Sequence, residues 1–477
     1  MKVQLRFILI PLGVVGFFVL LREVQWRPGY FANSTYLSAI LALEIVFACL
    51  LQFQKVFFPV TMGIFVWAGT ALPFSGESFT IRWLFLAVGA LAGFSIWMRT
   101  NRAKHFGLFH LVALFCVFSA LASASASSEP ITAFLKVGSL FLLFLYTSTG
   151  ARVALAGREP SFVRGLVLAC EILVFVASLF YFSGYNIFGN PNNLGAVIGV
   201  VATPVLLWAA LVAEERAERQ RRYTALALCA VLLYATVCRA AIIADTVVII
   251  VFTLALRRPQ LLLKAAFAAA LLLEIMAVAN PSHMGELMDS LSGRFVFKID
   301  AHRTKTGVFG SRETPWDDTI AAVKQHPWFG TGFGTSDLGS EQIGIQESSI
   351  YTTEGSNREH GSSYLAMAEY MGLLGILPFL FLLVLVLRAA GRAYAWVRTT
   401  GSPNHYAVPF AMVILAGLIH AGFEDWLFAA GSYLCLFFWV SAFALEDLAP
   451  EVNASPQVST SSSFSAFARQ GFRQPTR

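Results

Sequence analysis

Polar residues that stand inside long apolar stretches are the first candidates for chemistry, because an unpaired charge is costly there. Arg239 lies in VLLYATVCRAAIIADTVVII, with apolar residues on both sides. A guanidinium stays charged in a partly dry site and can bind phosphate oxygens through two parallel hydrogen bonds. Arg239 is therefore a candidate phosphate ligand. The alternative is an interfacial arginine whose side chain reaches outward to water.

His360 is the candidate for proton transfer. It follows Arg358 and Glu359 and opens an apolar segment in REHGSSYLAMAEYMGLLGILPF. Imidazole is the natural general base near neutral pH. Glu424 and Asp425, in FEDWLFAAG, could position that base or bind an acceptor, or they could form a solvated turn.

Two further segments have both a plain and a functional interpretation. Asn190, Asn192 and Asn193 surround a proline at the start of an apolar block, a pattern that begins helices well. Their amides and the helix N-terminus could also hold an anion or sugar hydroxyls. HPWFGTGFGTSDLG (326–339) is not a nucleotide-binding G-x-G-x-x-G pattern, and we interpret its glycines as turn formers.

The composition decides what kind of body positions these residues. Of 477 residues, 57% are apolar and 13% are charged, against about 25% charged in soluble domains. This excludes a soluble enzyme, a disordered protein and a secreted disulfide scaffold. The net charge of +6 comes from basic residues between apolar blocks, where topology signals belong, so we expect no nucleic-acid binding. The six cysteines lie in apolar blocks and form no CxxC pair, which predicts that they are buried. The sequence also has no HExxH motif, so we expect no metal site.

The apolar blocks predict an all-α, polytopic integral membrane protein with about fourteen transmembrane helices. The predicted spans are 5–21, 36–52, 56–74, 83–98, 106–122, 131–149, 162–182, 192–214, 223–238, 239–256, 261–279, 362–387, 405–422 and 427–446. The predicted regions are helices 1–11 (1–279), a large periplasmic loop with short helices (280–361), helices 12–14 (362–447) and a disordered cytoplasmic tail (448–477).

Lysine and arginine concentrate in alternate short connections, which by the positive-inside rule places both termini in the cytoplasm. The long loop and nearly all the unusual polar residues then fall on the outer face. We expect a site at that face.

The stretch from Arg312 to Gly375 resembles the O-antigen ligase and O-antigen polymerase superfamily. The matching pieces are Arg312 followed by Trp316, then HPWFGTGFGT, His360 and SYLAMAEYMGLLGILPF. Upstream, FGNPNNLG and CRAAI look like the paired Asn-Pro-Asn and membrane-arginine motifs of that family. The resemblance spans residues about 185–385.

The chain departs from the family pattern at two places. Cys238 stands where the family often has serine, and one extra residue separates His360 from Tyr364. Arg294 and Arg312 both match the family's loop arginine. Arg312 is preferred because a tryptophan follows four residues later.

The resemblance implies a GT-C-like glycosyltransferase of the bacterial inner membrane that works at the periplasmic face without metal or cofactor. Its donor would be a glycan on undecaprenyl diphosphate, and its acceptor a sugar hydroxyl. REHGSSYL and FEDWLFAAG look more like polymerases of O-antigen or exopolysaccharide repeat units than like ligases to lipid A–core. The implied partners are these substrates, the lipid bilayer and a chain-length regulator or other polysaccharide assembly proteins.

The resemblance also implies roles for the candidate residues. His360 would act as the base, and Arg239 and Arg312, with Arg294 as a further candidate, would bind the diphosphate. The expected substrate contacts are Asn190, Asn192, Asn193, Tyr364, Glu424 and Asp425.

A lipid-linked sugar flippase or secondary transporter is the alternative from another class. Glu44, Glu171 and Asp245 lie inside predicted spans and could carry protons. The sequence has no recognisable inverted repeat, and its polar residues gather at one face, which suits a one-sided site better than alternating access.

Overall fold

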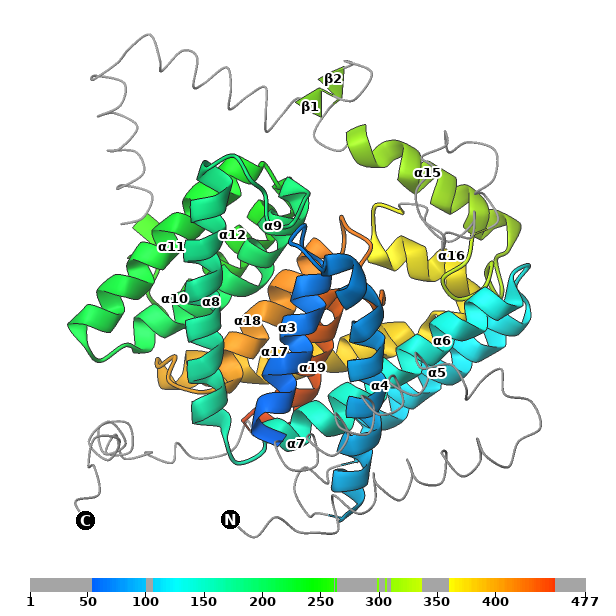
Figure 1. Ribbon diagram of the computed structural model, residues 1–477, viewed down its shortest axis with the longest axis horizontal. Helices are drawn as coiled ribbons and strands as arrows, with labels where there is room; N and C mark the ends of the chain where they lie inside the picture. Colours follow the sequence, from blue (N-terminus) through cyan, green and yellow to red (C-terminus); the bar gives the residue numbers. More distant parts are fainter. Residues whose placement is uncertain are drawn as a thin grey trace, which may run out of the picture.

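The computed structural model describes residues 54–99, 106–260, 262–263, 298–299, 305–306, 310–336 and 360–450. Almost all of this part of the chain is helical, as the apolar blocks predict (Figure 1). The predicted spans 5–21 and 36–52, all of 261–279 except residues 262–263, and Arg294 and Glu44 lie outside the described residues.

The first half of the described chain forms a series of helices. They are α3 (Gln54–Ala68), α4 (Ser75–Arg99), α5 (Leu108–Ser125), α6 (Pro130–Leu145), η1 (Tyr146–Ala151), α7 (Arg152–Leu155), α8 (Glu159–Phe182), α9 (Pro191–Val197), η2 (Ile198–Ala202), α10 (Thr203–Val212), α11 (Arg216–Thr236) and α12 (Arg239–Ala255). The π-helical turns η1 and η2 join their neighbours into two continuous helices.

The second half begins in the predicted outer loop. It contains the two-residue antiparallel strands β1 (Lys298–Ile299) and β2 (Lys305–Thr306), then the helices α15 (Gly310–Gln325), α16 (Ser363–Gly375), α17 (Leu377–Thr400), α18 (Ala407–His420) and α19 (Tyr433–Leu448). Figure 1 shows α15 and α16 at one end of the bundle, beside the α5–α6 hairpin.

Helix boundaries follow from local chemistry. The Asn190 side chain accepts a hydrogen bond from the Asn192 backbone N–H (2.8 Å) and caps α9, with Pro191 in its first turn. Val237 takes a left-handed conformation (φ 53°) that ends α11 and sets Arg239 at the start of α12. The boundary predicted between residues 238 and 239 therefore coincides with the break between α11 and α12.

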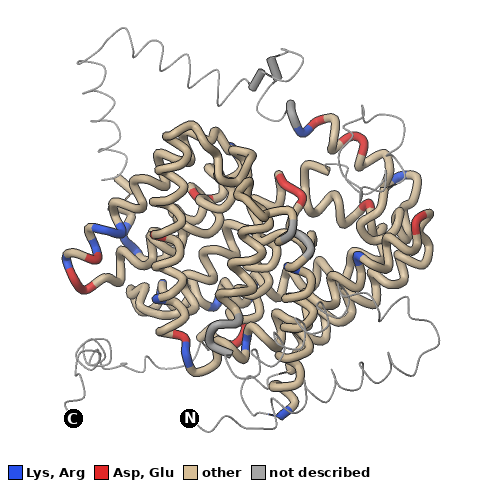
Figure 2. Tube along the Cα trace, viewed as in Figure 1, with Lys and Arg blue, Asp and Glu red and all other residues tan. Residues whose placement is uncertain are grey.

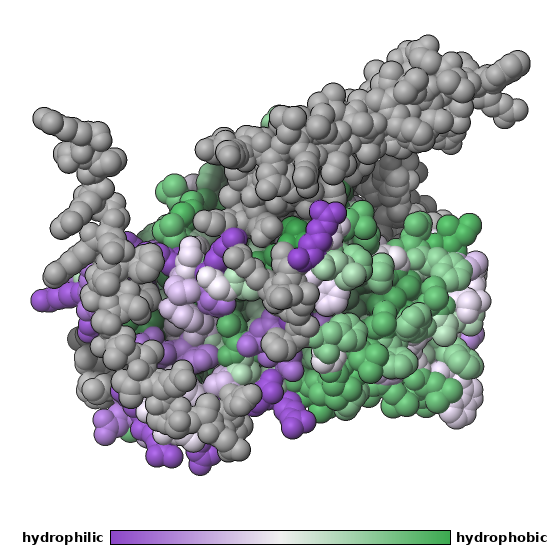
Figure 3. Space-filling view, turned by 90° about the horizontal axis from the view of Figure 1, so that it is seen from below, coloured by the Kyte–Doolittle hydropathy of each residue, from purple (hydrophilic) through white to green (hydrophobic). Residues whose placement is uncertain are grey.

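The interior is formed by α18 and α19, whose residues are almost all buried between the surrounding helices. Among the described residues, six helical segments are long and apolar enough to cross a membrane. They are Ile81–Arg99, Leu108–Ser125, Pro130–Leu155, Glu159–Phe182, Pro191–Val212 and Leu377–Thr400. Large apolar side chains are exposed on the outward faces of α5, α6, α8 and α17, and Figure 3 shows a broad apolar surface. Such a surface suits contact with lipid.

The predicted span 362–387 is divided into two helices. Gly372 has a non-helical backbone conformation (φ 63°), and the Leu373 N–H donates to the Pro327 carbonyl at 2.7 Å instead of continuing the helix. The membrane-length helix is α17, from Leu377 to Thr400, while α16 is a short helix at the end of the bundle. Both pieces are apolar, so hydropathy alone merged them.

The described arginines gather where α7 meets α8, between α10 and α11 and in the second half of α17. Figure 2 shows the densest group of basic residues at the tip between α10 and α11, on the left of the view. Several of these cations are paired: Arg152 with Asp447 at 2.5 Å, and Arg221 with Glu171 at 2.9 Å. The pairing gives Glu171, one of the candidate proton carriers, a partner in the resting structure.

Candidate active site

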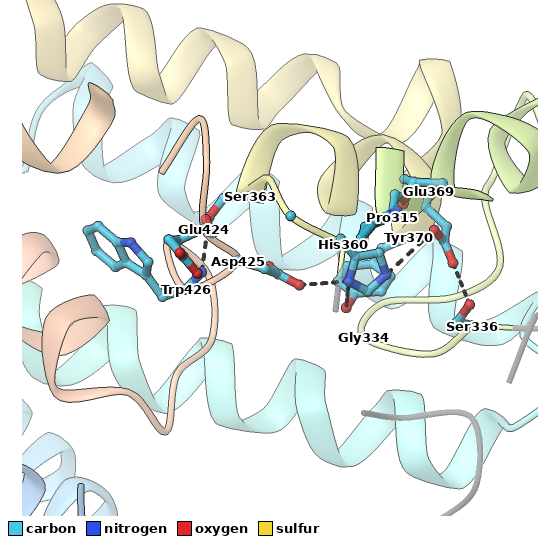
Figure 4. Close-up of polar contacts among 12 residues, drawn as sticks. Pro315, Gly334, Ser336, His360, Ser363, Glu369, Tyr370, Glu424, Asp425 and Trp426 are labelled. Atoms are coloured by element: carbon cyan, nitrogen blue, oxygen red, sulfur yellow. Dashed lines mark hydrogen bonds and ion pairs between the residues drawn. The ribbon is translucent and has the colours of Figure 1, made fainter. Parts of the chain in front are cut away.

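His360 lies between two carboxylates at the end of the bundle (Figure 4). Its Nδ1 is 2.7 Å from Asp425 Oδ2, and its Nε2 is 3.5 Å from Glu369 Oε2. The Ser336 hydroxyl donates to the other Glu369 oxygen at 2.5 Å, and the Tyr370 ring meets the imidazole edge-on at 5.0 Å. His360 is 1% exposed and Glu369 is fully buried, so the packing around them fixes their orientation.

The charges around His360 decide its protonation. Desolvation by burial lowers the pKa of the imidazole, but the hydrogen bonds and negative charges of Asp425 and Glu369 outweigh it and raise the pKa to about 9. At neutral pH the resting ring is therefore an imidazolium between two carboxylates. Asp425 is the more exposed of the two acids, at 24%. Because hydrogen bonds hold the imidazole in place, this cluster can take up or release a proton at a fixed position.

Ser363 ties the start of α16 to the turn that carries Glu424 and Asp425. Its hydroxyl donates to the Glu424 carbonyl at 2.7 Å and accepts from the backbone N–H groups of Trp426 (3.0 Å) and Leu427 (3.1 Å). Three bonds to one hydroxyl fix the turn against the helix. The two carboxylates are thus held in place rather than forming a loose solvated turn.

Arg312 comes to the same site from α15. Its Nη2 pairs with Glu424 Oε1, and both side chains are largely buried. Trp316, one helical turn later, donates its indole N–H to the Gly361 carbonyl at 3.1 Å and so fixes α15 beside His360. The spacing of Arg312 and Trp316 places both on one face of α15. Arg239 begins α12, which packs against α18, the helix that leads into the turn with Glu424 and Asp425.

The glycine-rich segment positions Glu369 through its backbone. Thr331 N–H donates to the Glu369 carbonyl at 2.9 Å, and Gly332 N–H donates to the Tyr370 carbonyl at 3.2 Å. Gly330 has φ +70° and lies so close that a Cβ there would be 2.3 Å from the Glu369 carbonyl oxygen. The turn interpretation is confirmed, and the glycines have the additional task of allowing this close approach.

The α5–α6 hairpin supports the same segment from the other side. The Ser123 hydroxyl contacts the Phe329 and Tyr370 carbonyls at 2.9 and 2.5 Å, and Lys136 Nζ donates to the Gly334 carbonyl. The α5–α6 hairpin, which is distant in sequence, therefore fixes the position of α16 and with it the position of Glu369.

Gly330→Ala is expected to destabilise this end of the protein by about 1–3 kcal/mol, because a side chain at positive φ is strained and its Cβ would meet backbone. Differential scanning fluorimetry of the purified protein should show a lower Tm, together with reduced glycan transfer. Gly138→Ala on α6 is the matched control, because no atom lies within 4 Å of its Cβ position. Equal Tm values for the two variants would contradict the close-approach role.

The asparagines are not brought to His360. Asn190 serves as the cap of α9, and the helix packs against the break between α11 and α12, where a Cβ on Gly195 would be 2.3 Å from Cys238 Cβ. They therefore belong to the neighbourhood of Arg239. Tyr364 donates its hydroxyl to the Leu418 carbonyl at 2.6 Å, which joins α16 to α18.

Two residues of the site were not predicted, Glu369 and Ser336. Glu369 is the one acid in the apolar stretch SYLAMAEYMGLLGILPF, a pattern that itself marks a functional position. Ser336 carries no such signal, because serines are common in loops.

Among the described residues, no group of three or more histidines, cysteines and acids is arranged to hold a metal ion. The five cysteines in this part of the chain are all buried and free, which confirms the predicted burial for Cys116, Cys170, Cys229, Cys238 and Cys435. Asp245 is also buried, and its Oδ1 has no hydrogen-bond partner within the described part of the chain.

The fold and the site together define an apolar helical membrane protein with a charged cluster built at one end. Comparison with known families places it further: residues 224–380 match the family model described as O-antigen ligase. The match covers about a third of the chain and includes Arg239, Arg312, His360 and Glu369. It confirms the resemblance to the O-antigen ligase and polymerase superfamily, and it supports a membrane polysaccharide ligase or polymerase. No curated protein matches the chain.

Proposed function

We propose that this protein transfers glycan from an undecaprenyl-diphosphate-linked donor to a sugar hydroxyl at the periplasmic face of the inner membrane, and that it polymerises O-antigen or exopolysaccharide repeat units. The observation that carries the proposal is His360 held between Asp425 and Glu369, beside the Arg312–Glu424 pair. This arrangement places an imidazole that can exchange a proton next to a guanidinium that can bind an anion.

The proposed reaction requires the protein to stabilise the leaving group and to accept a proton from the acceptor hydroxyl. The bond from the anomeric carbon to the diphosphate oxygen breaks, and Arg239 and Arg312 stabilise the negative charge that grows on the leaving group. The acceptor oxygen attacks the same carbon from the opposite side, and its proton passes to His360 once the ring is neutral. In-line attack inverts the anomeric centre. The stabilised diphosphate leaves without a strong general acid.

The charge distribution supports the proposed orientation. Most described arginines lie at the end of the bundle where α7 meets α8, α10 meets α11 and α17 ends, whereas His360 lies at the start of α16. By the positive-inside rule that end faces the cytoplasm, which leaves the cluster at the periplasmic face.

A ligase that attaches glycan to lipid A–core is the second candidate, and the description of the matching family favours it. Both activities use the same donor chemistry and the same leaving group. They differ in the acceptor, which would approach from the side of the His360 cluster.

A deletion strain and the same strain carrying the wild-type gene test the proposal, with lipid-linked and surface glycans separated on one gel. Single repeat units stranded on the carrier in the deletion strain would establish a polymerase. Long chains stranded on the carrier beside bare lipid A–core would establish a ligase instead. A deletion strain whose lipid-linked and surface glycans both match those of the complemented strain would overturn both activities.

A further inference from the structure

His420, the last residue of α18, has a protonation state that its neighbour determines. The Trp426 indole Nε1 is 2.9 Å from His420 Nδ1. An indole N–H can only donate, so Nδ1 must be the acceptor and carries no proton. The ring is then neutral, and its one proton sits on Nε2.

The Nε2–H of His420 is a buried donor for which the described part of the chain offers no acceptor. His420 is 1% exposed, and its Nε2 has no hydrogen-bond partner within the described part of the chain. Buried polar groups are nearly always hydrogen-bonded, so a donor left open in this way calls for an explanation. A ligand that brings its own acceptor oxygen is one.

The surroundings define the chemistry of that ligand. His420 precedes Glu424 by four residues, and Glu424 forms an ion pair with Arg312. The helix α12, which begins at Arg239, packs against α18, which ends at His420, so these three residues lie on neighbouring elements. Two guanidinium groups that repel each other are stabilised by an anion between them. A neutral N–H donor adds a hydrogen bond to that anion without adding a third positive charge.

We propose that His420 donates its Nε2–H to an oxygen of the substrate diphosphate and forms, with Arg239 and Arg312, the binding site of the leaving group. This inference rests on the proposed function, and it gives His420 a binding role that is separate from the proton transfer at His360. The Trp426 hydrogen bond acts on this role indirectly, because it fixes the proton on Nε2.

Two substitutions separate the binding role from a structural one. In His420→Asn the amide oxygen replaces Nδ1 and keeps the bond from Trp426, but nothing replaces the Nε2–H. In His420→Gln the longer side chain returns an N–H near the Nε2 position and gives up the Trp426 bond. A binding role predicts that Gln retains more function than Asn, whereas a purely structural role predicts the reverse order.

The readout is the affinity of the full-length protein in nanodiscs for undecaprenyl diphosphate, the lipid product of the proposed reaction, together with Tm. We expect His420→Asn to weaken binding about tenfold or more, as for the loss of one hydrogen bond to a charged group, with Tm close to wild type. His420→Gln should lose less affinity than Asn while lowering Tm.

The outcomes also separate this inference from the proposed function. Unchanged affinity in His420→Asn, with weakened binding in Arg312→Ala, would overturn the role of His420 and leave the diphosphate site in place. A wild-type protein that does not bind undecaprenyl diphosphate would overturn the proposed function and this inference with it. If the wild-type protein binds undecaprenyl diphosphate, and His420→Gln binds it more tightly than His420→Asn, the proposed function and this inference would both be supported.

Discussion

Replacing His360 by alanine is expected to lower the rate of glycan transfer by about 10²–10⁴-fold, the usual contribution of a positioned general base. The imidazole is held by Asp425 and Glu369, so its removal leaves two neighbouring carboxylates without the cation between them. Transfer is measured with purified protein and lipid-linked donor. His405→Ala is the control, because the His405 ring packs against the Trp396 ring, tilted at 54° with the centroids 4.9 Å apart, in the connection after α17 at the opposite end of the bundle.

The pH dependence tests the same role with the wild-type protein. The carboxylates raise the pKa of His360 to about 9, so at pH 7 most rings carry the proton that a general base must first lose. The neutral fraction grows about tenfold per pH unit below the pKa. We therefore expect kcat/KM to rise from pH 7 and to level off above about pH 9. A rate that falls above pH 9 would show that the imidazolium itself is required and would contradict the base role.

Replacing Arg312 by alanine is expected to lower kcat by about 10²–10³-fold, the effect of removing one preorganised donor from a developing anion. Arg312→Lys should recover little of the lost rate. A lysine ammonium is a point charge, whereas the planar guanidinium can donate to Glu424 and to a phosphate oxygen at the same time. The measurement is single-turnover transfer at saturating donor.

Arg392→Ala is the matched control for Arg312. Arg392 pairs with Glu446 at 2.9 Å, and both side chains are about a third exposed, at the end of the bundle away from His360. Exposed pairs of this kind contribute little to stability, so transfer should be unchanged. Full activity of Arg312→Lys would leave Arg312 as a structural partner of Glu424 and would remove it from the diphosphate site.

Much of the fold could be predicted because hydropathy reports directly on burial in lipid. The break before Arg239 and the cap at Asn190 were also readable, since both depend on residues that are adjacent in the chain. The division between α16 and α17 was not, because it depends on hydrogen bonds from Leu373 and Leu374 to Pro327 and Trp328, far upstream. The hydropathy of the sequence contains no information about such long-range contacts.

The site was predicted by residue type more than by geometry. His360, Arg312, Glu424 and Asp425 were identified because charged groups beside apolar segments are unusual, and the structure brings these four together. Which acid meets which base could not be predicted, since the partners lie on different elements. Glu369 was missed because its segment was assigned to the interior of a span.

The end of the bundle around α16 is assembled largely from main-chain hydrogen bonds. The segment 327–335, the second half of α16 and the α5–α6 hairpin meet through carbonyl and amide groups, with serine hydroxyls and glycines where the chains come close. Main-chain groups are the same whatever side chains they carry. We therefore expect this region to tolerate wide variation at positions such as Trp328 and Phe329, whose side chains are exposed, and almost none at Gly330. A mutational scan would then show a sparse set of intolerant positions, widely spaced in sequence and clustered in space.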